Sequence, residues 1–291
     1  MPGTLLEGKP LAEKIKVALA EEVKLREKEY RKVPKLVALQ MGENASSEIY
    51  VKNQKKAAEA LGIDYELRMV DDDMSQEEAE ALVLELNKDE FVTAMILQLP
   101  VPKQIDAKRL LNAIDPAKDA EGMHPANLGR ILMGNYRIGP CTAMAAMELL
   151  ESTGVKLYGK EAVVVGHSEI VGKPLALMLL SKFVTTTECQ IATGERGVLP
   201  EHVKRAEILI VAVGKAGLVK GDWIKDGAIV IDVGINKVGD KIVGDVEFDA
   251  AVQRASYITP VPGGVGPLTT TILMRNVVEL FKSQNRWINV F

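Results

Sequence analysis

The feature that most constrains the fold is a repeated alternation between short apolar segments and longer segments with helical periodicity. In the first half, helical patterns cover 10–31, 45–61 and a stretch that begins at Ser75, and they alternate with the apolar runs KLVALQMG, DYELRMV and VTAMILQLP. Ser75 and Glu78 have the spacing of a capping box, and Gly62 ends the second helix. This alternation predicts a mostly parallel sheet covered by helices, with ligands at the carboxyl ends of the strands.

The same alternation starts again near Gly159. The helical segment KPLALMLLSK is preceded by EAVVVG and followed by TECQIA, EILIVAVG, GAIVIDVG and YITPVPGG. Residues 114–140, rich in Pro, Gly and Asn, form the expected crossing between the halves. We therefore expect an α/β protein with two domains, 1–139 and 140–267, in which the amphipathic C-terminal helix 268–291 packs back on the first domain.

Composition narrows the functional classes. The 291 residues carry 36 basic and 40 acidic side chains, so no basic field favours nucleic acid or an anionic membrane as a partner. The two cysteines, Cys141 and Cys189, form no CxxC motif or Cys/His cluster, so we expect neither a disulfide framework nor a metal site. The first residues, MPGTLLEGKPLAEKIK, contain no apolar stretch typical of a signal peptide or membrane span. A soluble, cytoplasmic protein that acts on a small molecule is expected.

A nucleotide site is indicated by VVVGHSEIVGKPLA, in which an apolar strand enters a turn with Gly166 and Gly172 and a helix follows directly. Backbone amides at such a helix start can bind a pyrophosphate. Ser168 occupies the second glycine position of GxGxxG, so this stretch alone is equally compatible with an ordinary strand-to-helix turn. Two further glycine-bearing strand ends, IDVGIN at 231–236 and TPVPGGVGP at 259–267, favour a dinucleotide lying across the sheet.

Several motifs occur together in one order: YV at 50–51, LQLPVP at 97–102, KDAEGMHPANLG at 118–129, GPCT at 139–142, GHSEIVGKP at 166–174, DVGIN at 232–236 and PVPGGVGP at 260–267. With these motifs the chain resembles the methylenetetrahydrofolate dehydrogenase/cyclohydrolase family of the bacterial FolD type, from about residue 3 to 283. The resemblance implies a homodimer of two-domain α/β subunits with a Rossmann-like second domain. It also implies a cleft between the domains where a tetrahydrofolate substrate meets NADP or NAD. The implied reactions are oxidation of 5,10-methylenetetrahydrofolate to the methenyl form and hydrolysis of that form to 10-formyltetrahydrofolate.

The resemblance also implies roles for individual residues. Tyr50 stacks on the pterin, Gln98 borders the reactive carbon, and the catalytic positions also include Gln54 and Glu121. Further folate contacts are implied for Lys52, Leu99, Val101, Pro262, Gly263 and Gly264. Cofactor contacts are implied for Gly166, His167, Ser168, Ile170, Val171, Gly172, Pro174, Ile191, Gly214, Ile235, Gly266 and Thr269.

One departure from the family pattern concerns the residue four after Tyr50, where the pattern has lysine and this chain has Gln54. Hydride transfer mainly requires placement of the reactants, whereas hydrolysis requires a group that carries protons, whose loss typically costs about 10²- to 10⁴-fold in rate. At about 100° per residue, Lys55 is turned a quarter circle from Gln54, and Lys52 and Lys56 point nearly the opposite way. We therefore expect a dehydrogenase with weak or absent cyclohydrolase activity.

Two alternatives stay open on the sequence alone. One is a full bifunctional enzyme in which Lys55 or an ordered water transfers the proton, and the other is a catalytically silent folate-binding paralogue.

Other departures affect both ligands. Glu121 replaces the usual Asp, which places the carboxylate on an arm one methylene longer, although Glu121 could instead cap or pair with a neighbouring base. His167 stands where the family commonly has Arg, and no arginine is present at the position expected to bind the 2′-phosphate of NADP. The sequence therefore gives NAD and NADP equal weight.

Overall fold

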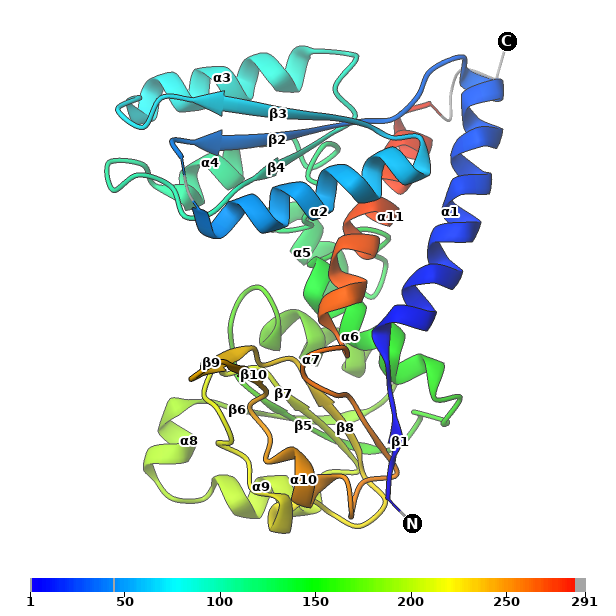
Figure 1. Ribbon diagram of the computed structural model, residues 1–291, viewed down its shortest axis with the longest axis vertical. Helices are drawn as coiled ribbons and strands as arrows, with labels where there is room; N and C mark the ends of the chain where they lie inside the picture. Colours follow the sequence, from blue (N-terminus) through cyan, green and yellow to red (C-terminus); the bar gives the residue numbers. More distant parts are fainter. Residues whose placement is uncertain (1, 44, 286–291) are drawn as a thin grey trace. The chain divides into compact units, whose positions relative to one another are not determined.

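The computed structural model describes residues 2–43 and 45–285, with the side chains of 45–47 left out of that description (Figure 1). The chain divides into two compact units. Among the described residues, the six-stranded unit contains 2–13, 131–135 and 140–269. The three-stranded unit contains 14–43, 45–130, 136–139 and 270–285.

The three-stranded unit is built on a parallel sheet of order β3-β2-β4. Its strands are β2 (Lys35–Met41), β3 (Asp64–Val70) and β4 (Ala94–Leu97), and its helices include α2 (Ala45–Leu61), α3 (Gln76–Lys88) and α4 (Ala107–Ala113). β2 and β4 pack through Leu39 and Met95 against the apolar face of α3, where Val83 is buried. The predicted capping box is confirmed, because Ser75 and Glu78 exchange side-chain and backbone hydrogen bonds at the start of α3.

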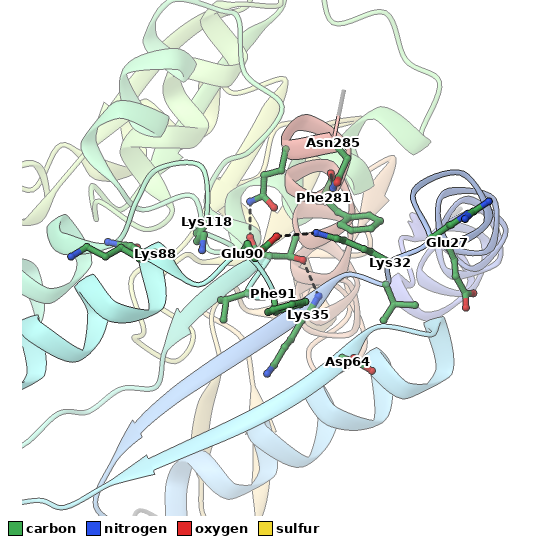
Figure 2. Close-up of a pocket in the computed structure, with 16 residues that line it drawn as sticks. Glu27, Lys32, Lys35, Asp64, Lys88, Glu90, Phe91, Lys118, Phe281 and Asn285 are labelled. Atoms are coloured by element: carbon green, nitrogen blue, oxygen red, sulfur yellow. Dashed lines mark hydrogen bonds and ion pairs between the residues drawn. The ribbon is translucent and has the colours of Figure 1, made fainter. Parts of the chain in front are cut away.

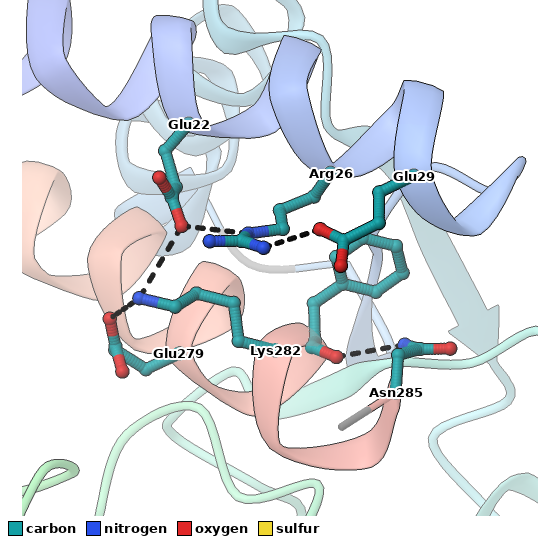
Figure 3. Close-up of polar contacts among 7 residues, drawn as sticks. Glu22, Arg26, Glu29, Glu279, Lys282 and Asn285 are labelled. Carbon is teal, nitrogen blue, oxygen red and sulfur yellow. Dashed lines mark hydrogen bonds and ion pairs between the residues drawn. The ribbon is translucent and has the colours of Figure 1, made fainter. Parts of the chain in front are cut away.

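Two long helices contact each other within the three-stranded unit, namely the C-terminal part of α1 (Gly8–Tyr30) and of α11 (Gly266–Asn285). The Tyr30 and Phe281 rings meet edge to face at a centroid distance of 5.5 Å. Lys282 Nζ lies 3.5 Å from Glu22 Oε1, and Arg26 Nε lies 2.9 Å from the same oxygen (Figure 3). Because these charges are partly exposed, we expect the buried apolar side of α11 to contribute more stability than the ion pairs.

The six-stranded unit has a parallel sheet of order β1-β11-β8-β7-β5-β6. The strands β5 (Glu161–Val165), β7 (Ile208–Val211) and β8 (Ile229–Asp232) correspond to predicted apolar runs, and the edge strand β6 (Thr185–Cys189) overlaps a predicted run only at its end. Every residue of β7 and β8 is buried, as expected for parallel strands covered on both faces. The helices α6 (Cys141–Ser152), α7 (Gly172–Leu180), α9 (Leu199–Arg205) and α10 (Phe248–Ala251) also belong to this unit.

The structure differs from the sequence prediction at several short elements. β1 (Thr4–Leu5) pairs in parallel with β11 (Tyr257–Ile258), so the first residues lie in the sheet of the six-stranded unit, although the sequence assigned 1–139 to the first domain. A two-residue strand has no periodicity that sequence could reveal. The run TECQIA contains the end of β6 and the start of α8 (Ile191–Glu195), and the β9 (Asn236–Val238) and β10 (Lys241–Val243) hairpin was not predicted.

The segment expected to cross between the halves also contains a helix, α5 (Pro125–Leu132). Its start is fixed by Asp119, whose carboxylate accepts hydrogen bonds from the His124 amide at 2.8 Å and the Asn127 side chain at 2.9 Å. Within the described part of the chain, no helix is both long and apolar enough to cross a bilayer.

Candidate functional site

The inward face of α2 is defined by Gln54, which is only 7% exposed and lies one turn before the fully buried Ala58. Lys52, Lys55 and Lys56 are all exposed. Tyr50, one turn before Gln54, presents 62% of its surface to solvent. An exposed aromatic ring next to an inward-facing amide on one helix face can stack on a planar ligand while the amide binds the ligand's polar edge.

Gln54 lies at the centre of a hydrogen-bonded cluster from three elements. Its side-chain oxygen Oε1 accepts from Gln98 Nε2 at 2.9 Å and from the Tyr65 hydroxyl at 3.0 Å. Gln98 directly follows β4, Tyr65 lies on β3, and Gln54 lies on α2. Burial raises the pKa of Tyr65 to about 12, so its hydroxyl stays neutral and able to donate. Tyr65 was not among the predicted site residues, and its only signal in the sequence was its position in a predicted strand.

Glu121 follows a residue that is bridged to β4. Asp119 forms an isolated parallel bridge with Met95, and the chain turns directly after it, at Ala120 and Glu121. The Asp119 carboxylate is satisfied by local donors, including the Gly122 amide at 2.9 Å. The Glu121 carboxyl group has no hydrogen-bond partner within residues 2–43 and 45–285, and burial, assisted by the Asp119 charge, raises its pKa to about 8.

Other residues assigned to the folate side follow Gln98 directly. Leu99 is 49% exposed and precedes Pro100 through a cis peptide bond, and Val101 is partly buried. Gln98, Leu99 and Val101 thus lie at the carboxyl end of β4, where the parallel-sheet argument places ligands. Lys52 points away from Gln54 and is exposed.

In the six-stranded unit, Gly166 and Gly172 permit a tight turn between β5 and α7. Gly166 has a φ of 120°, and a Cβ atom at Gly172 would lie 1.9 Å from the Gly166 carbonyl oxygen. Ser168, the residue that breaks the glycine motif, accepts a hydrogen bond from the Val171 amide through its hydroxyl at 3.1 Å. The turn therefore keeps a compact shape. The Lys173 amide donates to the Ser168 carbonyl at 3.1 Å and Pro174 has no amide, so Gly172 has the amide at the start of α7 that can bind an anion.

Four large apolar side chains are exposed along this edge of the six-stranded sheet. They follow β5, β6, β7 and β8 in turn and are Ile170 (49% exposed), Ile191 (77%), Val213 (38%) and Ile235 (61%). His167 is exposed next to them. Exposed apolar side chains gathered at the carboxyl ends of four neighbouring parallel strands are typical of a surface that a ligand covers.

Two buried aspartates hold the loops at this edge. Asp245 accepts hydrogen bonds from the amides of Val213 (2.7 Å), Gly214 (3.0 Å) and Lys215 (2.8 Å) and from the Asn236 side chain (2.8 Å). Asp232 accepts from the Gly234, Asp245 and Val246 amides, and burial raises its pKa to about 6 despite these bonds. Neither role was predicted from the sequence. Asp232 stands in the DVGIN motif, but nothing in the sequence marks Asp245.

The PVPGGVGP segment also lies in the six-stranded unit. Pro262 follows a cis bond, Gly263 has a φ of 118°, and its carbonyl accepts from the Gly8 amide at 2.8 Å. A Cβ atom at Gly264 would lie 2.7 Å from the Thr259 Cβ. Gly266 begins α11, and the hydroxyl of Thr269 bonds back to the Val265 carbonyl.

A cavity of about 940 Å³ lies elsewhere, at the amino ends of β2, β3 and β4 (Figure 2). Lys35 and Asp64 at the strand starts line it, and so does Phe281. Its charges are largely compensated by the protein: Lys32 Nζ lies 3.3 Å from Glu90, and Lys118 Nζ donates to two backbone carbonyls. Because Gln98 lies at the opposite strand ends, this cavity is not part of the predicted folate site.

No group of three or more His, Cys, Asp or Glu residues in the described part of the chain could hold a metal ion. The described residues at the edge of the six-stranded sheet suit a dinucleotide instead, because they combine a glycine turn at a helix start with exposed apolar side chains.

Comparison with known proteins bears on both units. The family model described as tetrahydrofolate dehydrogenase/cyclohydrolase, catalytic domain, matches residues 6–121, and that of the NAD(P)-binding domain matches 140–285. The chain is 48% identical over 281 residues to the bifunctional protein FolD 2 of Geobacter sulfurreducens, covering 96% of this chain and 97% of the relative. It is 44% identical over 282 residues to the bifunctional protein FolD of a Nitratiruptor species, covering 97% and 99%.

Solved structures of FolD-type enzymes are also similar to this chain. The bifunctional FolD methylenetetrahydrofolate dehydrogenase/cyclohydrolase of Campylobacter jejuni superposes with a TM-score of 0.92 at 40% identity, covering 97% of this chain and 99% of that one. The Trypanosoma brucei enzyme, solved with NADP cofactor and an inhibitor, also has a TM-score of 0.92, at 39% identity and with 98% and 99% covered. With its two α/β units and its NAD(P)-binding domain, the chain belongs to the tetrahydrofolate dehydrogenase/cyclohydrolase family.

Proposed function

We propose that the protein is an NAD(P)-dependent methylenetetrahydrofolate dehydrogenase in which the cyclohydrolase reaction is weak or lost. The weak or lost cyclohydrolase reaction is inferred from the identity and hydrogen bonds of Gln54. This amide occupies the position where the family pattern has lysine, it is 7% exposed, and its oxygen already accepts two hydrogen bonds.

The site residues Tyr50 and Gln98 are suited to hydride transfer. Loss of a hydride from the methylene carbon leaves a cation shared by two folate nitrogens, and no proton moves in that step, so catalysis depends on placement. Tyr50 provides an exposed ring for stacking, and Gln98 provides an amide held in place by Gln54. The nicotinamide ring, when bound, accepts the hydride. The loops fixed by Asp245 and the turn at Gly166 and Gly172 would hold its dinucleotide.

Hydrolysis makes a demand that Gln54 does not meet. Water must lose protons as it adds to the methenyl carbon, and a ring nitrogen must gain one as the ring opens. An amide neither accepts nor releases a proton near neutral pH. The three neighbouring lysines are exposed, and none occupies the buried position of Gln54.

Full bifunctional activity is the second candidate, and two observations favour it. The relatives named above are called bifunctional, so they support the presence of cyclohydrolase activity rather than its loss. In addition, Glu121 has a pKa of about 8 and no hydrogen-bond partner among the described residues, so it is a proton carrier suited to neutral pH. In that case Glu121 would take over the task of the missing lysine.

An absorbance assay tests the dehydrogenase. Purified protein is mixed with methylenetetrahydrofolate and either NAD or NADP, and formation of the methenyl product is followed. Turnover with at least one cofactor is expected, and turnover with neither would refute the proposal in favour of a folate-binding paralogue. Since the exposed His167 stands where the family commonly has arginine, the ratio of the two rates also reports cofactor preference. The homodimer implied by the family is tested by sedimentation of the same preparation.

A further inference from the structure

We propose that Tyr65 is a positioning residue that fixes the Gln54 side chain with its carbonyl oxygen occupied, so that the Gln54 NH₂ group is the donor left for the folate ligand. The proposal rests on the proposed function, because it concerns the same site. Tyr65 does not touch the reacting atoms in this account and acts only through Gln54.

Gln54 uses only part of its hydrogen-bonding capacity within the protein. A side-chain amide oxygen has two lone pairs and its nitrogen has two N–H donors. Both lone pairs of Gln54 Oε1 are used, by Gln98 Nε2 at 2.9 Å and by the Tyr65 hydroxyl at 3.0 Å. Gln54 Nε2 donates to no side chain or backbone group within the described residues, and it is not among their buried polar atoms that lack a partner. The nitrogen is therefore open to solvent or a ligand.

Two side chains, Gln98 and Tyr65, hold the Gln54 amide in this orientation. Gln98 alone does not determine which way the Gln54 amide points. Each side-chain amide carries a donor and an acceptor, so after a half-turn of both amides Gln54 would donate to Gln98 and one hydrogen bond would still form. Tyr65 favours the observed orientation, because its hydroxyl donates to the Gln54 oxygen. After a half-turn the hydroxyl could only accept from the NH₂ group, and its own proton would have no acceptor among the described residues. Burial raises the pKa of Tyr65 to about 12, so the hydroxyl keeps its proton across the working range of pH.

The position of Tyr65 in the sheet brings its hydroxyl to Gln54. It lies on the edge strand β3, paired with Leu36 of β2, and α2 returns along the sheet to bring Gln54 within reach of the hydroxyl. Neighbouring strand residues at 64 and 66 point to the other face because side chains alternate along a strand. Tyr65 is thus the residue of this strand end that reaches Gln54.

The consequence is a neutral cluster of two amides and one phenol that presents a donor. It recognises a hydrogen-bond acceptor on the ligand, such as a carbonyl oxygen or an unprotonated ring nitrogen. A neutral donor also avoids the repulsion that an ammonium group would exert on the methenyl cation, so binding of that product is favoured.

The test is a double-mutant cycle read by calorimetric titration with tetrahydrofolate, which needs no turnover. Tyr65→Phe should weaken tetrahydrofolate binding about fivefold, the size expected for loss of one neutral hydrogen bond, and should leave the KM for NAD(P) within about twofold. In a Gln54→Ala background, Tyr65→Phe should have no further effect on binding. Equal losses in both backgrounds would mean that Tyr65 acts structurally, and the proposal would fail.

Two further variants sharpen the result. Gln54→Glu keeps an acceptor for Tyr65 and Gln98 but removes the NH₂ donor, so it should bind tetrahydrofolate at least as weakly as Gln54→Ala. Binding as tight as that of the unmodified chain would overturn the proposal. Tyr158→Phe, at an exposed position of the six-stranded unit, is the matched control and should change neither ligand. A chain that binds tetrahydrofolate but transfers no hydride would refute the proposed function and still permit this cycle.

Discussion

Replacing Glu121 by glutamine should make the stability of the protein less dependent on pH. The pKa of Glu121 is raised from 4.5 to about 8 in the folded chain, chiefly because burial disfavours the charged form. Between these values the unfolded chain has released the proton and the folded chain still holds it. Folding stability therefore falls as pH rises from 4.5 towards 8 and stays level above 8.

The pKa difference sets an upper limit on the effect. Subtracting 4.5 from 8 gives 3.5 units, and at about 1.4 kcal/mol per unit this corresponds to about 5 kcal/mol. Because Glu121 retains some solvent contact, we expect a smaller effect of about 1–3 kcal/mol. Glu121→Gln has no proton to release, so the variant should gain stability relative to the unmodified chain as pH rises.

Urea unfolding at pH 5 and pH 8 measures this difference for both proteins. The free energy of unfolding of Glu121→Gln minus that of the unmodified chain should be larger at pH 8 by about 1–3 kcal/mol. Glu195→Gln, at an exposed position, serves as the control for removing a carboxylate. A difference for Glu121→Gln that is the same at both pH values would show that its carboxyl group is not desolvated and would remove the argument for Glu121 as a neutral acid.

Three other substitutions test separate parts of the site. Gln54→Lys should speed methenyl hydrolysis at least about 100-fold, measured by decay of the methenyl absorbance, and no gain would contradict the assignment of Gln54. Asp245→Ala leaves four donors without their acceptor. It should raise the KM for NAD(P) and lower the free energy of unfolding, measured by urea titration, by about 2–4 kcal/mol. An unchanged KM and an unchanged free energy of unfolding would contradict the role of Asp245 in holding the loops. Gly172→Ala places a Cβ atom 1.9 Å from a backbone carbonyl oxygen, so NAD(P) binding measured by calorimetry should weaken at least about tenfold while folate binding persists. Gly194→Ala meets nothing within 4 Å and is its control, which should bind like the unmodified chain.

Sequence periodicity was sufficient for the main elements. The runs KLVALQMG and DYELRMV became β2 and β3, and Ser75 with Glu78 opened α3, because burial of parallel strands and helix capping are local properties of the sequence. The strand β1 was not predictable, since two residues carry no period and their pairing with β11 depends on residues more than 250 positions away.

In the site, too, some features were predictable from the sequence and others were not. Helix geometry alone separated Gln54 from the lysines at 52, 55 and 56, and the structure places Gln54 inside and these lysines outside. Tyr65 and Asp245 could not be found this way, because their partners are brought near them only by the sheet and its loops. The desolvation of Glu121 likewise depends on neighbours that are distant in sequence.

Separation of hydride transfer from hydrolysis is tested most directly by adding methenyltetrahydrofolate to the unmodified protein and following the decay of its absorbance. The decay rate is compared with that in buffer and with the rate of methenyl formation by the same preparation. We expect decay close to that in buffer and far slower than formation. Decay at a rate matching formation would contradict the proposed loss of cyclohydrolase activity and would assign proton transfer to another group, first of all Glu121.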